Sequence, residues 1–253
     1  MEAHLGLVLM AFVASINCLE YEHPQLLRSI DVDCFTDCLD YRTRGGHDKA
    51  SGVITTLSQD GECNQESYCD METDGGGWTV FQRHQSDAVN FTRGWDDYKN
   101  GFGDLSDSFW WGNEKLAQAL NDGRQYELRI DLFDWEGENR YAKYSYFNVA
   151  AETDNYRVRF SGYTGNAGGD SFGDANGKHF STIDRDNDAW SGNCAVRWGG
   201  GGFWYHSCFR FSPNSRYSRN SRVPGSLGLH WYAWHGFHYS LKAVAMMYRP
   251  ITN

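Results

Sequence analysis

The chain has 253 residues, with 33 acidic and 23 basic side chains, so its formal net charge is −10. This acidity argues against generic binding to nucleic acids or anionic membranes, because both favour a basic protein surface. Charged residues make up 22% and hydrophobic residues 40% of the chain, which predicts a folded protein of one large or two small domains. Aromatic residues reach 16%, which suggests that the core and the binding surface depend on large rings.

The first 18 residues predict a signal peptide. The apolar run from Leu5 to Ala14 is too short to span a bilayer, and small or polar residues follow it up to Cys18. A buried N-terminal helix is the alternative interpretation. No later stretch has the length and hydrophobicity of a transmembrane helix, so we expect a secreted, extracellular protein. Residues 19–33 form a short polar linker, without the heptads or Gly-X-Y triplets of an oligomerising stalk.

Seven cysteines fit an oxidising compartment. Cys18 lies at or near the expected cleavage site and would be available to link two chains if cleavage leaves it in place. The other six form an even set, which indicates disulfides in a secreted chain: Cys34, Cys38, Cys63, Cys69, Cys194 and Cys208. Zinc is the alternative for the first four, although their spacing does not match the CxxC pattern of zinc sites.

Alternating apolar and polar residues predict several strands after the turn-rich segment that holds the early cysteines. Residues 126–134 show the clearest alternation. We expect further strands at 78–83, 142–150, 156–161 and 241–248. One short amphipathic helix is expected over 113–120, with Gly123 ending it. Strands without long helices between them favour an antiparallel sheet that is covered on one side.

The long segment 162–240 has little periodicity and contains a dense acidic motif that starts with Asp184, Asp186 and Asp188. Alternate carboxylates in a loop suit Ca²⁺, which takes roughly six to eight oxygen ligands, including backbone carbonyls. The motif is not an EF-hand, because Ala189 and Ala195 stand where that loop requires Gly and Glu. On these residues alone, a calcium loop and a solvated acidic loop are equally supported.

The two late cysteines enclose Trp198, four glycines and the aromatic run Phe203-Trp-Tyr205. Closing a loop of about 15 residues contributes roughly 3 kcal/mol in the chain-entropy model of disulfides. The rings beside the glycines either line a pocket or pack under the loop, and the residues alone favour packing.

Two motifs that resemble catalytic or metal sites have simpler explanations. The segment from Gly169 to Gly173 matches the GxSxG pattern of hydrolase nucleophiles, but loop lies on both sides where a strand and a helix are required. Three histidines lie among aromatic residues, where packing in a strand is expected rather than metal binding: His230, His235 and His238.

The late loops also contain a local basic cluster, formed by Arg210, Arg216, Arg219 and Arg222. These side chains are either simply solvated or attract an anionic ligand to the loops. Earlier in the chain, Asn90-Phe-Thr92 is the only N-glycosylation sequon, and it predicts an exposed surface in a secreted protein.

In chain order, a series of motifs resembles the fibrinogen C-terminal globular domain. The series starts with Cys69-Asp-Met-Glu-Thr-Asp-Gly-Gly-Gly-Trp-Thr-Val-Phe-Gln-Arg, and it continues with Trp95-Asp-Asp-Tyr-Lys-Asn-Gly-Phe-Gly and Phe109-Trp-Trp-Gly-Asn-Glu-Lys. It ends with Phe180-Ser-Thr-Ile-Asp-Arg-Asp-Asn-Asp, Gly192-Asn-Cys-Ala and Trp204-Tyr-His-Ser-Cys. The resemblance covers about residues 34–253, and the loops are similar to those of ficolins and tachylectins, secreted lectins of innate immunity.

The resemblance implies an α+β fold with a small disulfide-bonded N-terminal subdomain, a central antiparallel sheet and a loop-rich subdomain that carries calcium and ligand. It implies the disulfides Cys34–Cys63, Cys38–Cys69 and Cys194–Cys208. It also implies a Ca²⁺ ion held by the side chains of Asp186 and Asp188 and by the carbonyls of Trp190 and Gly192.

The resemblance further implies an aromatic pocket for an acetyl group, with a cis peptide bond between Ser207 and Cys208 at its floor. Trp198 and Phe237 are expected at two walls. The sequence departs from the family pattern here, since Phe209 replaces the usual His, and Gly225-Ser226 stands where several lectins have Tyr-Ala. We therefore expect a pocket of three rings without a histidine, with Ser226 on its rim.

These features predict a secreted, calcium-dependent pattern-recognition lectin that binds acetylated or anionic glycans on microbial surfaces and catalyses no reaction. The alternative is a fibrinogen-like protein-binding ligand that uses the same surface for a receptor or a clotting partner. The calcium motif favours the lectin, whereas the altered pocket favours the alternative. In the absence of a stalk, we expect avidity to come from self-association into a homo-oligomer.

Overall fold

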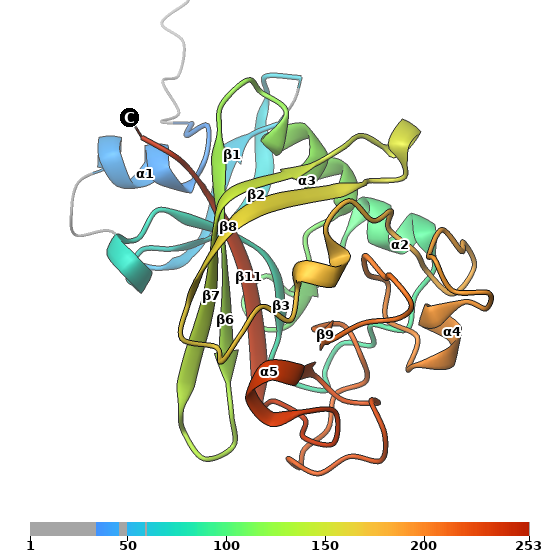
Figure 1. The fold of residues 1–253 in the computed structure, drawn as a ribbon. Helices are drawn as coiled ribbons and strands as arrows, with labels where there is room; N and C mark the ends of the chain where they lie inside the picture. The colour runs from blue at the N-terminus through green and yellow to red at the C-terminus, as the bar shows by residue number, and fades with distance from the viewer. Residues whose placement is uncertain (1–33, 46–49, 59, 253) are drawn as a thin grey trace, which may run out of the picture. The chain divides into compact units, whose positions relative to one another are not determined.

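The structure, a computed structural model, describes residues 34–45, 50–58 and 60–252 (Figure 1). The expected signal peptide, the linker and Cys18 lie outside these residues. Within the described ranges, no helix combines the length and the hydrophobicity that crossing a membrane requires.

In the part of the chain that the structure describes, a nine-stranded sheet forms the centre of the domain. Its main path is β1-β2-β3-β11-β6-β7-β8, with antiparallel pairing throughout, and β4 and β5 attach beside β3. The strands are β1 (Gly52–Leu57), β2 (Cys63–Asp70), β3 (Trp78–His84), β4 (Phe102–Gly103), β5 (Phe109–Trp110), β6 (Tyr126–Phe133), β7 (Asn139–Val149), β8 (Val158–Gly165) and β11 (Ala243–Pro250). The last strand therefore lies in the middle of the sheet, which ties the end of the chain to its first half.

The described residues form short helices: α1 (Cys38–Gly45), α2 (Trp95–Asn100), α3 (Asn113–Leu120), α4 (Cys194–Arg197) and α5 (Tyr232–His235). In Figure 1 α1 and α3 lie beside the sheet, whereas α4 and α5 lie among the late loops. Turns of 3₁₀ helix occur at Thr73–Gly75, Glu152–Asp154 and Gly173–Ala175. Between β8 and β11 the chain is mostly loop, with one small sheet of β9 (Phe211–Ser212) and β10 (His230–Trp231). In Figure 1 these orange and red loops gather around α4, β9 and α5.

The predicted strands and helix occur within a few residues of their expected bounds. The helix over 113–120 is confirmed as α3, although Asn121 rather than Gly123 is its C-cap. Sequence reasoning missed α1, α2 and the β1–β2 hairpin. The hairpin was missed because β2 contains few apolar residues, and its buried positions are held by Ser67, Cys69 and pairing with β3.

Three disulfides connect the pairs that the resemblance implies: Cys34–Cys63, Cys38–Cys69 and Cys194–Cys208. The first two attach α1 and the preceding residues to β2. The third closes the late glycine-rich loop.

A buried network of aromatic rings attaches the loop-rich segment to the sheet. Trp204, from the run after the four glycines, lies 5.9 Å from Trp110 of β5 and 5.2 Å from Phe180 between ring centroids. Its indole Nε1 donates to the Tyr156 carbonyl at 2.7 Å. Because Phe203 and Tyr205 are also buried, the run packs beneath the loop and does not line an open pocket.

Candidate functional site

The acidic loop that begins at Asp184 contains three carboxylates. Asp184 has a structural role, whereas Asp186 and Asp188 form the candidate calcium site. Asp184 Oδ1 accepts hydrogen bonds from the Trp95 backbone N–H at 2.9 Å and from the Thr182 hydroxyl at 2.6 Å. It therefore satisfies the first N–H of α2 and joins this loop to that helix.

The Asp188 carboxylate organises the acidic loop, because backbone N–H groups of the following residues donate to it. The Trp190 N–H donates to Asp188 Oδ1 and the Cys194 N–H donates to Asp188 Oδ2, both at 2.8 Å. The Asp188 N–H in turn donates to Asp186 Oδ1 at 3.2 Å. Among the described residues, no Lys, Arg or His forms an ion pair with either carboxylate.

The electrostatics of this pair favour a bound cation. Burial raises the pKa of Asp188, and the neighbouring Asp186 raises it further, against the opposite effect of the two backbone hydrogen bonds. Two adjacent carboxylates without a basic partner repel each other, and a divalent cation between them would remove this repulsion.

The two carbonyls expected to complete the calcium site are free to do so. Neither the Trp190 nor the Gly192 carbonyl accepts a hydrogen bond from any residue within the described ranges. The residues present thus offer two carboxylates and two carbonyls in one tight loop, and waters would supply the remaining ligands of Ca²⁺. This donor set consists only of oxygen, which suits a hard cation better than zinc.

The acidic loop is directly bonded to the segment that contains the cis peptide. The Ala189 N–H donates to the His206 carbonyl at 3.0 Å, and the Cys194–Cys208 disulfide joins the same two segments. The Ser207–Cys208 peptide bond is cis. The His206 N–H donates to the Cys208 carbonyl at 2.8 Å, which closes a tight turn over the cis bond.

Next to this turn, aromatic rings form a continuous row. The ring centroids of Trp198 and Phe209 are 6.4 Å apart, and those of Phe209 and His230 are 5.1 Å apart. His230 is in turn 5.3 Å from Phe237. We call these four residues the ring row. The expectation of three rings without a histidine is wrong, because His230 of β10 lies between the two phenylalanines.

His230 is a neutral imidazole in this position. It is 1% exposed, and burial lowers its pKa to about 4. Its Nδ1 lies 3.2 Å from the Gly228 carbonyl, so Nδ1 carries the proton and Nε2 is left as an acceptor. Nε2 has no hydrogen-bond partner among the described residues. Sequence reasoning assigned His230 to aromatic packing and missed its place in the row, since no local pattern links it to Phe209.

The four glycines at 199–202, which follow Trp198 and are called the glycine turn, contact the glycosylation sequon. Thr92 Oγ1 donates to the Gly199 carbonyl at 3.1 Å, and Thr92 pairs with Gly201. A Cβ on Gly200 would lie 2.4 Å from Thr92 Cγ2, and the φ of Gly200 is +85°, so no other residue fits there. Asn90 itself is exposed.

Ser207 is exposed and Ser226 is half-buried. The segment that holds Ser226 lies near the glycine turn, because a Cβ on Gly199 would lie 3.9 Å from the Leu227 carbonyl oxygen. A place for Ser226 on the rim of a ligand pocket stays a prediction.

The motif from Gly169 to Gly173 has a structural role. Ser171 is buried, and its hydroxyl accepts the Ala233 N–H at 2.9 Å, which holds α5 against this turn. The other two histidines of that aromatic stretch have different surroundings from His230. His235 Nε2 is 3.3 Å from Asp134 Oδ2, next to Glu136, and His238 is exposed.

The four arginines differ in how much of their charge is available. Arg219 forms a two-pronged ion pair with Asp87, with a closest contact of 2.7 Å. Arg210 lies over the Tyr232 ring at 5.0 Å. Within the described residues, Arg210, Arg216 and Arg222 have no carboxylate partner, so three of the four remain able to attract an anion.

Comparison with known proteins decides the family. The family model described as "Fibrinogen beta and gamma chains, C-terminal globular domain" matches residues 34–251. The chain belongs to this family. The fibrinogen C-terminal domain is a non-enzymatic α+β fold with an antiparallel sheet and disulfides, which confirms both the predicted fold class and the expectation of no catalysis.

Several relatives are similar over most of the chain. Human angiopoietin-related protein 7 is 39% identical over 238 residues, which cover 93% of this chain and 67% of that protein. Techylectin-5A from Tachypleus tridentatus is 40% identical over 227 residues, 85% of this chain and 74% of that protein. Lamprey fibrin D-dimer in complex with the peptide ligand Gly-His-Arg-Pro-amide has a TM-score of 0.77 at 34% identity, covering 87% of this chain and 76% of that one.

Proposed function

We propose that this chain is a secreted, calcium-dependent pattern-recognition lectin that binds acetylated or anionic glycans on microbial surfaces. In this proposal residues 1–18 are a signal peptide, 19–33 a linker and 34–253 the recognition domain, which acts as a homo-oligomer. The observation that carries the proposal is the direct bonding of the acidic loop to the turn beside the ring row. An ion in that loop would therefore fix the geometry of the binding surface.

The proposed calcium site consists of the Asp186 and Asp188 carboxylates and the Trp190 and Gly192 carbonyls. Its support is the pair of adjacent carboxylates without a basic partner, together with two carbonyls that accept no hydrogen bond within the described ranges. Calcium would neutralise the pair and hold the loop in one conformation.

The proposed glycan site lies along the ring row, beside Ser207 and Cys208, with Ser226 at its rim. Trp198, Phe209 and Phe237 offer apolar contact to the methyl of an acetyl group. The backbone N–H groups of Ser207, Cys208 and Phe209 donate to no described residue, so they are available for the acetyl carbonyl oxygen. The unpaired arginines supply attraction for sulfated, phosphorylated or sialylated glycans.

A glycan array in the presence of calcium and of EDTA tests this function. The proposal expects acetylated or anionic glycans to bind with calcium and to lose binding in EDTA. Binding that is equal in both conditions, or the absence of any glycan ligand, would reject the lectin.

The alternative is a protein-binding ligand, and two observations favour it. The usual His of the pocket is replaced by Phe209, and the similar lamprey fibrin fragment was solved with a short peptide. If the ring row binds a peptide or a receptor, then Trp198→Ala abolishes that binding while the glycan array remains negative.

A further inference from the structure

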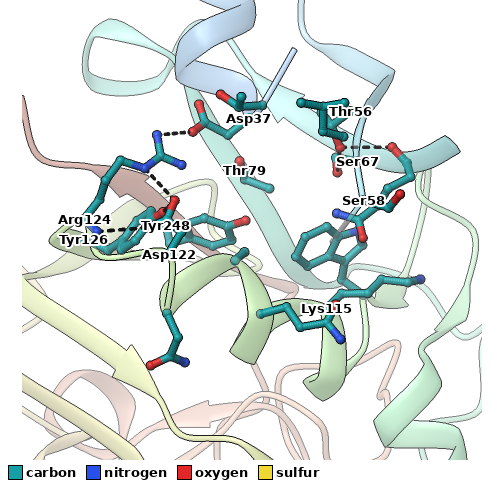
Figure 2. Close-up of a pocket in the computed structure, with 17 residues that line it drawn as sticks. Asp37, Thr56, Ser58, Ser67, Thr79, Lys115, Asp122, Arg124, Tyr126 and Tyr248 are labelled. Atoms are coloured by element: carbon teal, nitrogen blue, oxygen red, sulfur yellow. Dashed lines mark hydrogen bonds and ion pairs between the residues drawn. The ribbon is translucent and has the colours of Figure 1, made fainter. Parts of the chain in front are cut away.

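A polar cavity lies far from the ring row in sequence, between α3, the β1–β2 hairpin and the start of α1 (Figure 2). Its volume is about 340 Å³, and none of its lining residues belongs to the acidic loop or the ring row. We call it the α3 cavity. This volume is at the small end of the roughly 300–1,000 Å³ found for ligand sites, so a monosaccharide-sized molecule would fit.

One side of the α3 cavity is built from two carboxylates that share one guanidinium. Arg124 Nη1 lies 2.6 Å from Asp37 Oδ2, and Arg124 Nε lies 2.7 Å from Asp122 Oδ2. The Tyr126 hydroxyl also donates to Asp122 at 2.8 Å. Asp37 is only 6% exposed, and it is held in place because its Oδ1 accepts the Asp40 N–H at 2.9 Å while its Oδ2 pairs with Arg124. Each carboxylate oxygen has a second lone pair, which a ligand hydroxyl could use.

Next to the Asp37, Asp122 and Arg124 side chains, the wall of the α3 cavity carries buried hydroxyl groups. Thr79 is 2% exposed, and its Oγ1 has no well-formed hydrogen bond to any described residue; its contact with the Tyr248 hydroxyl is a loose one. Ser67 Oγ and Thr56 Oγ1 are 3.1 Å apart, and Thr56 donates to the Gln65 carbonyl. A buried hydroxyl that makes no well-formed hydrogen bond is unfavourable, and a ligand oxygen would satisfy it better than the Tyr248 contact does.

On the opposite side of the cavity from these carboxylates lies Lys115 of α3. Lys115 forms no ion pair within the described ranges, and its half-buried ammonium is poorly solvated, which lowers its pKa. A second cavity of about 490 Å³ shares Lys115 and Trp111 with the first. The Trp111 indole is held in place, since its Nε1 donates to the Glu66 carbonyl at 2.9 Å. Lys115 is thus a partly desolvated cation beside a flat ring; the Glu66 carboxylate offsets part of its charge from a distance but forms no ion pair with it.

From this arrangement we propose that the α3 cavity is a second ligand site for a small carboxylate-bearing polyol of the uronic-acid class. The ligand carboxylate pairs with Lys115, and its hydroxyls bond to Thr79 and Asp37. The Lys115 ammonium forms no ion pair, and the Thr79 hydroxyl makes no well-formed hydrogen bond, so a molecule rich in oxygen acceptors matches both. The carboxylate at Asp37 accepts from a ligand hydroxyl, which a simple anion does not offer. This site does not involve the proposed calcium loop.

The test measures binding of D-glucuronate, D-glucose and acetate to the full chain by ligand-detected NMR, with calcium and with EDTA. Glucuronate is expected to bind equally in both conditions, and glucose and acetate at least about tenfold more weakly, because each lacks one half of the recognition. If glucuronate does not bind, or if acetate binds as tightly, the proposal is wrong. EDTA is expected to remove glycan binding at the ring row but not glucuronate binding in the α3 cavity, so the two proposals can fail independently.

Two variants identify the site. Lys115→Met keeps the apolar stem and is expected to weaken glucuronate binding by about tenfold or more, whereas the exposed control Lys242→Met leaves it unchanged. Thr79→Val removes a hydroxyl that makes no well-formed hydrogen bond, so it is expected to weaken glucuronate binding roughly threefold while the melting temperature stays equal or rises. If Thr79→Val lowers the melting temperature and leaves binding intact, the hydroxyl serves Tyr248 and the proposed contact is wrong.

Discussion

The backbone N–H of Ala189 donates to the carbonyl of His206 at 3.0 Å, and this bond joins the acidic loop to the turn that contains the Ser207–Cys208 cis peptide. Together with the Cys194–Cys208 disulfide, it makes the two segments one unit. A conformational change in the acidic loop should therefore change the positions of the residues of the ring row.

The first prediction concerns calcium. Asp186→Ala and Asp188→Ala should each remove the calcium-dependent part of the stability, because each deletes one carboxylate of the proposed site. Binding to the folded state adds about 2.7 kcal/mol at a hundredfold excess of ligand over Kd. Differential scanning calorimetry with calcium and with EDTA measures the effect.

Asp184→Ala is the matched control, since Asp184 bonds to Trp95 and Thr182. It should lower the melting temperature equally in both conditions. A wild-type melting temperature that ignores EDTA would contradict the site.

The second prediction concerns the ring row. Trp198→Ala should abolish binding of acetylated sugars, because it removes one end of the apolar surface. Phe209→His restores a hydrogen-bonding group and should strengthen binding of neutral acetylated sugars by up to about tenfold, if 1.4 kcal/mol is regained. Titration calorimetry with N-acetylated and non-acetylated sugars measures both. Unchanged glycan binding by Trp198→Ala would show that the site lies elsewhere.

The third prediction separates the arginines by their partners. Arg216→Ala and Arg222→Ala should weaken binding of sulfated glycans, and wild-type binding should weaken as salt increases, since exposed charges are screened. Arg219→Ala should have little effect, because Asp87 already neutralises this side chain. Surface plasmon resonance at low and high salt provides the comparison. The arginine argument fails if neutral acetylated sugars bind more tightly at every salt concentration.

The fourth prediction is a pH dependence of stability. Burial lowers the pKa of His230 to about 4 in the folded protein, while a His in the unfolded chain has a pKa of about 6.5. Above pH 6.5 His230 is neutral in both the folded and the unfolded protein, so the free energy of unfolding has its full value. As the pH falls from about 6.5 towards 4, the unfolded state gains the proton first, and the free energy of unfolding decreases by up to roughly 3 kcal/mol.

Comparison of His230→Gln with the wild type isolates this effect, because other groups titrate in the same window. His84 acts in the same direction, since burial also lowers its pKa to about 4. Asp131 acts in the opposite direction, because burial raises its pKa to about 6. Urea unfolding at pH 7.5 and pH 4.5 should show a smaller loss of stability in His230→Gln. An equal loss in both proteins would contradict a buried neutral His230.

The sequence predicted the parts of the fold that have a regular hydrophobic period. The strand over 126–134 was found because Leu128, Ile130 and Leu132 alternate, and all three are buried. The β1–β2 hairpin was missed, because disulfides and neighbouring strands rather than apolar periodicity hold it in place. Short helices such as α2 were missed for a related reason, since the group that satisfies the first α2 N–H, Asp184, lies far along the chain.

In the candidate site too, contacts within one local motif could be predicted from the sequence, whereas contacts between distant segments could not. Asp186 and Asp188 lie within one local motif, so their proximity could be inferred from the sequence. The ring row brings together Trp198, Phe209, His230 and Phe237 from three separate segments, and no spacing rule places them in contact. His230 was therefore assigned to packing alone. The α3 cavity also combines distant residues, and its chemistry appears only when Asp37, Thr79 and Lys115 are brought together by the fold.

The contact between Thr92 and Gly199 affects the choice of expression system. Asn90 is exposed two residues before a threonine that is bonded to the glycine turn, so an oligosaccharide on Asn90 would be attached at the border of the ring row. Protein from a bacterial host, which lacks this oligosaccharide, would present a more open surface than protein from a secretory eukaryotic host. Large polysaccharides should be more sensitive to this difference than single sugars, and Asn90→Gln produced in the eukaryotic host should restore the bacterial behaviour.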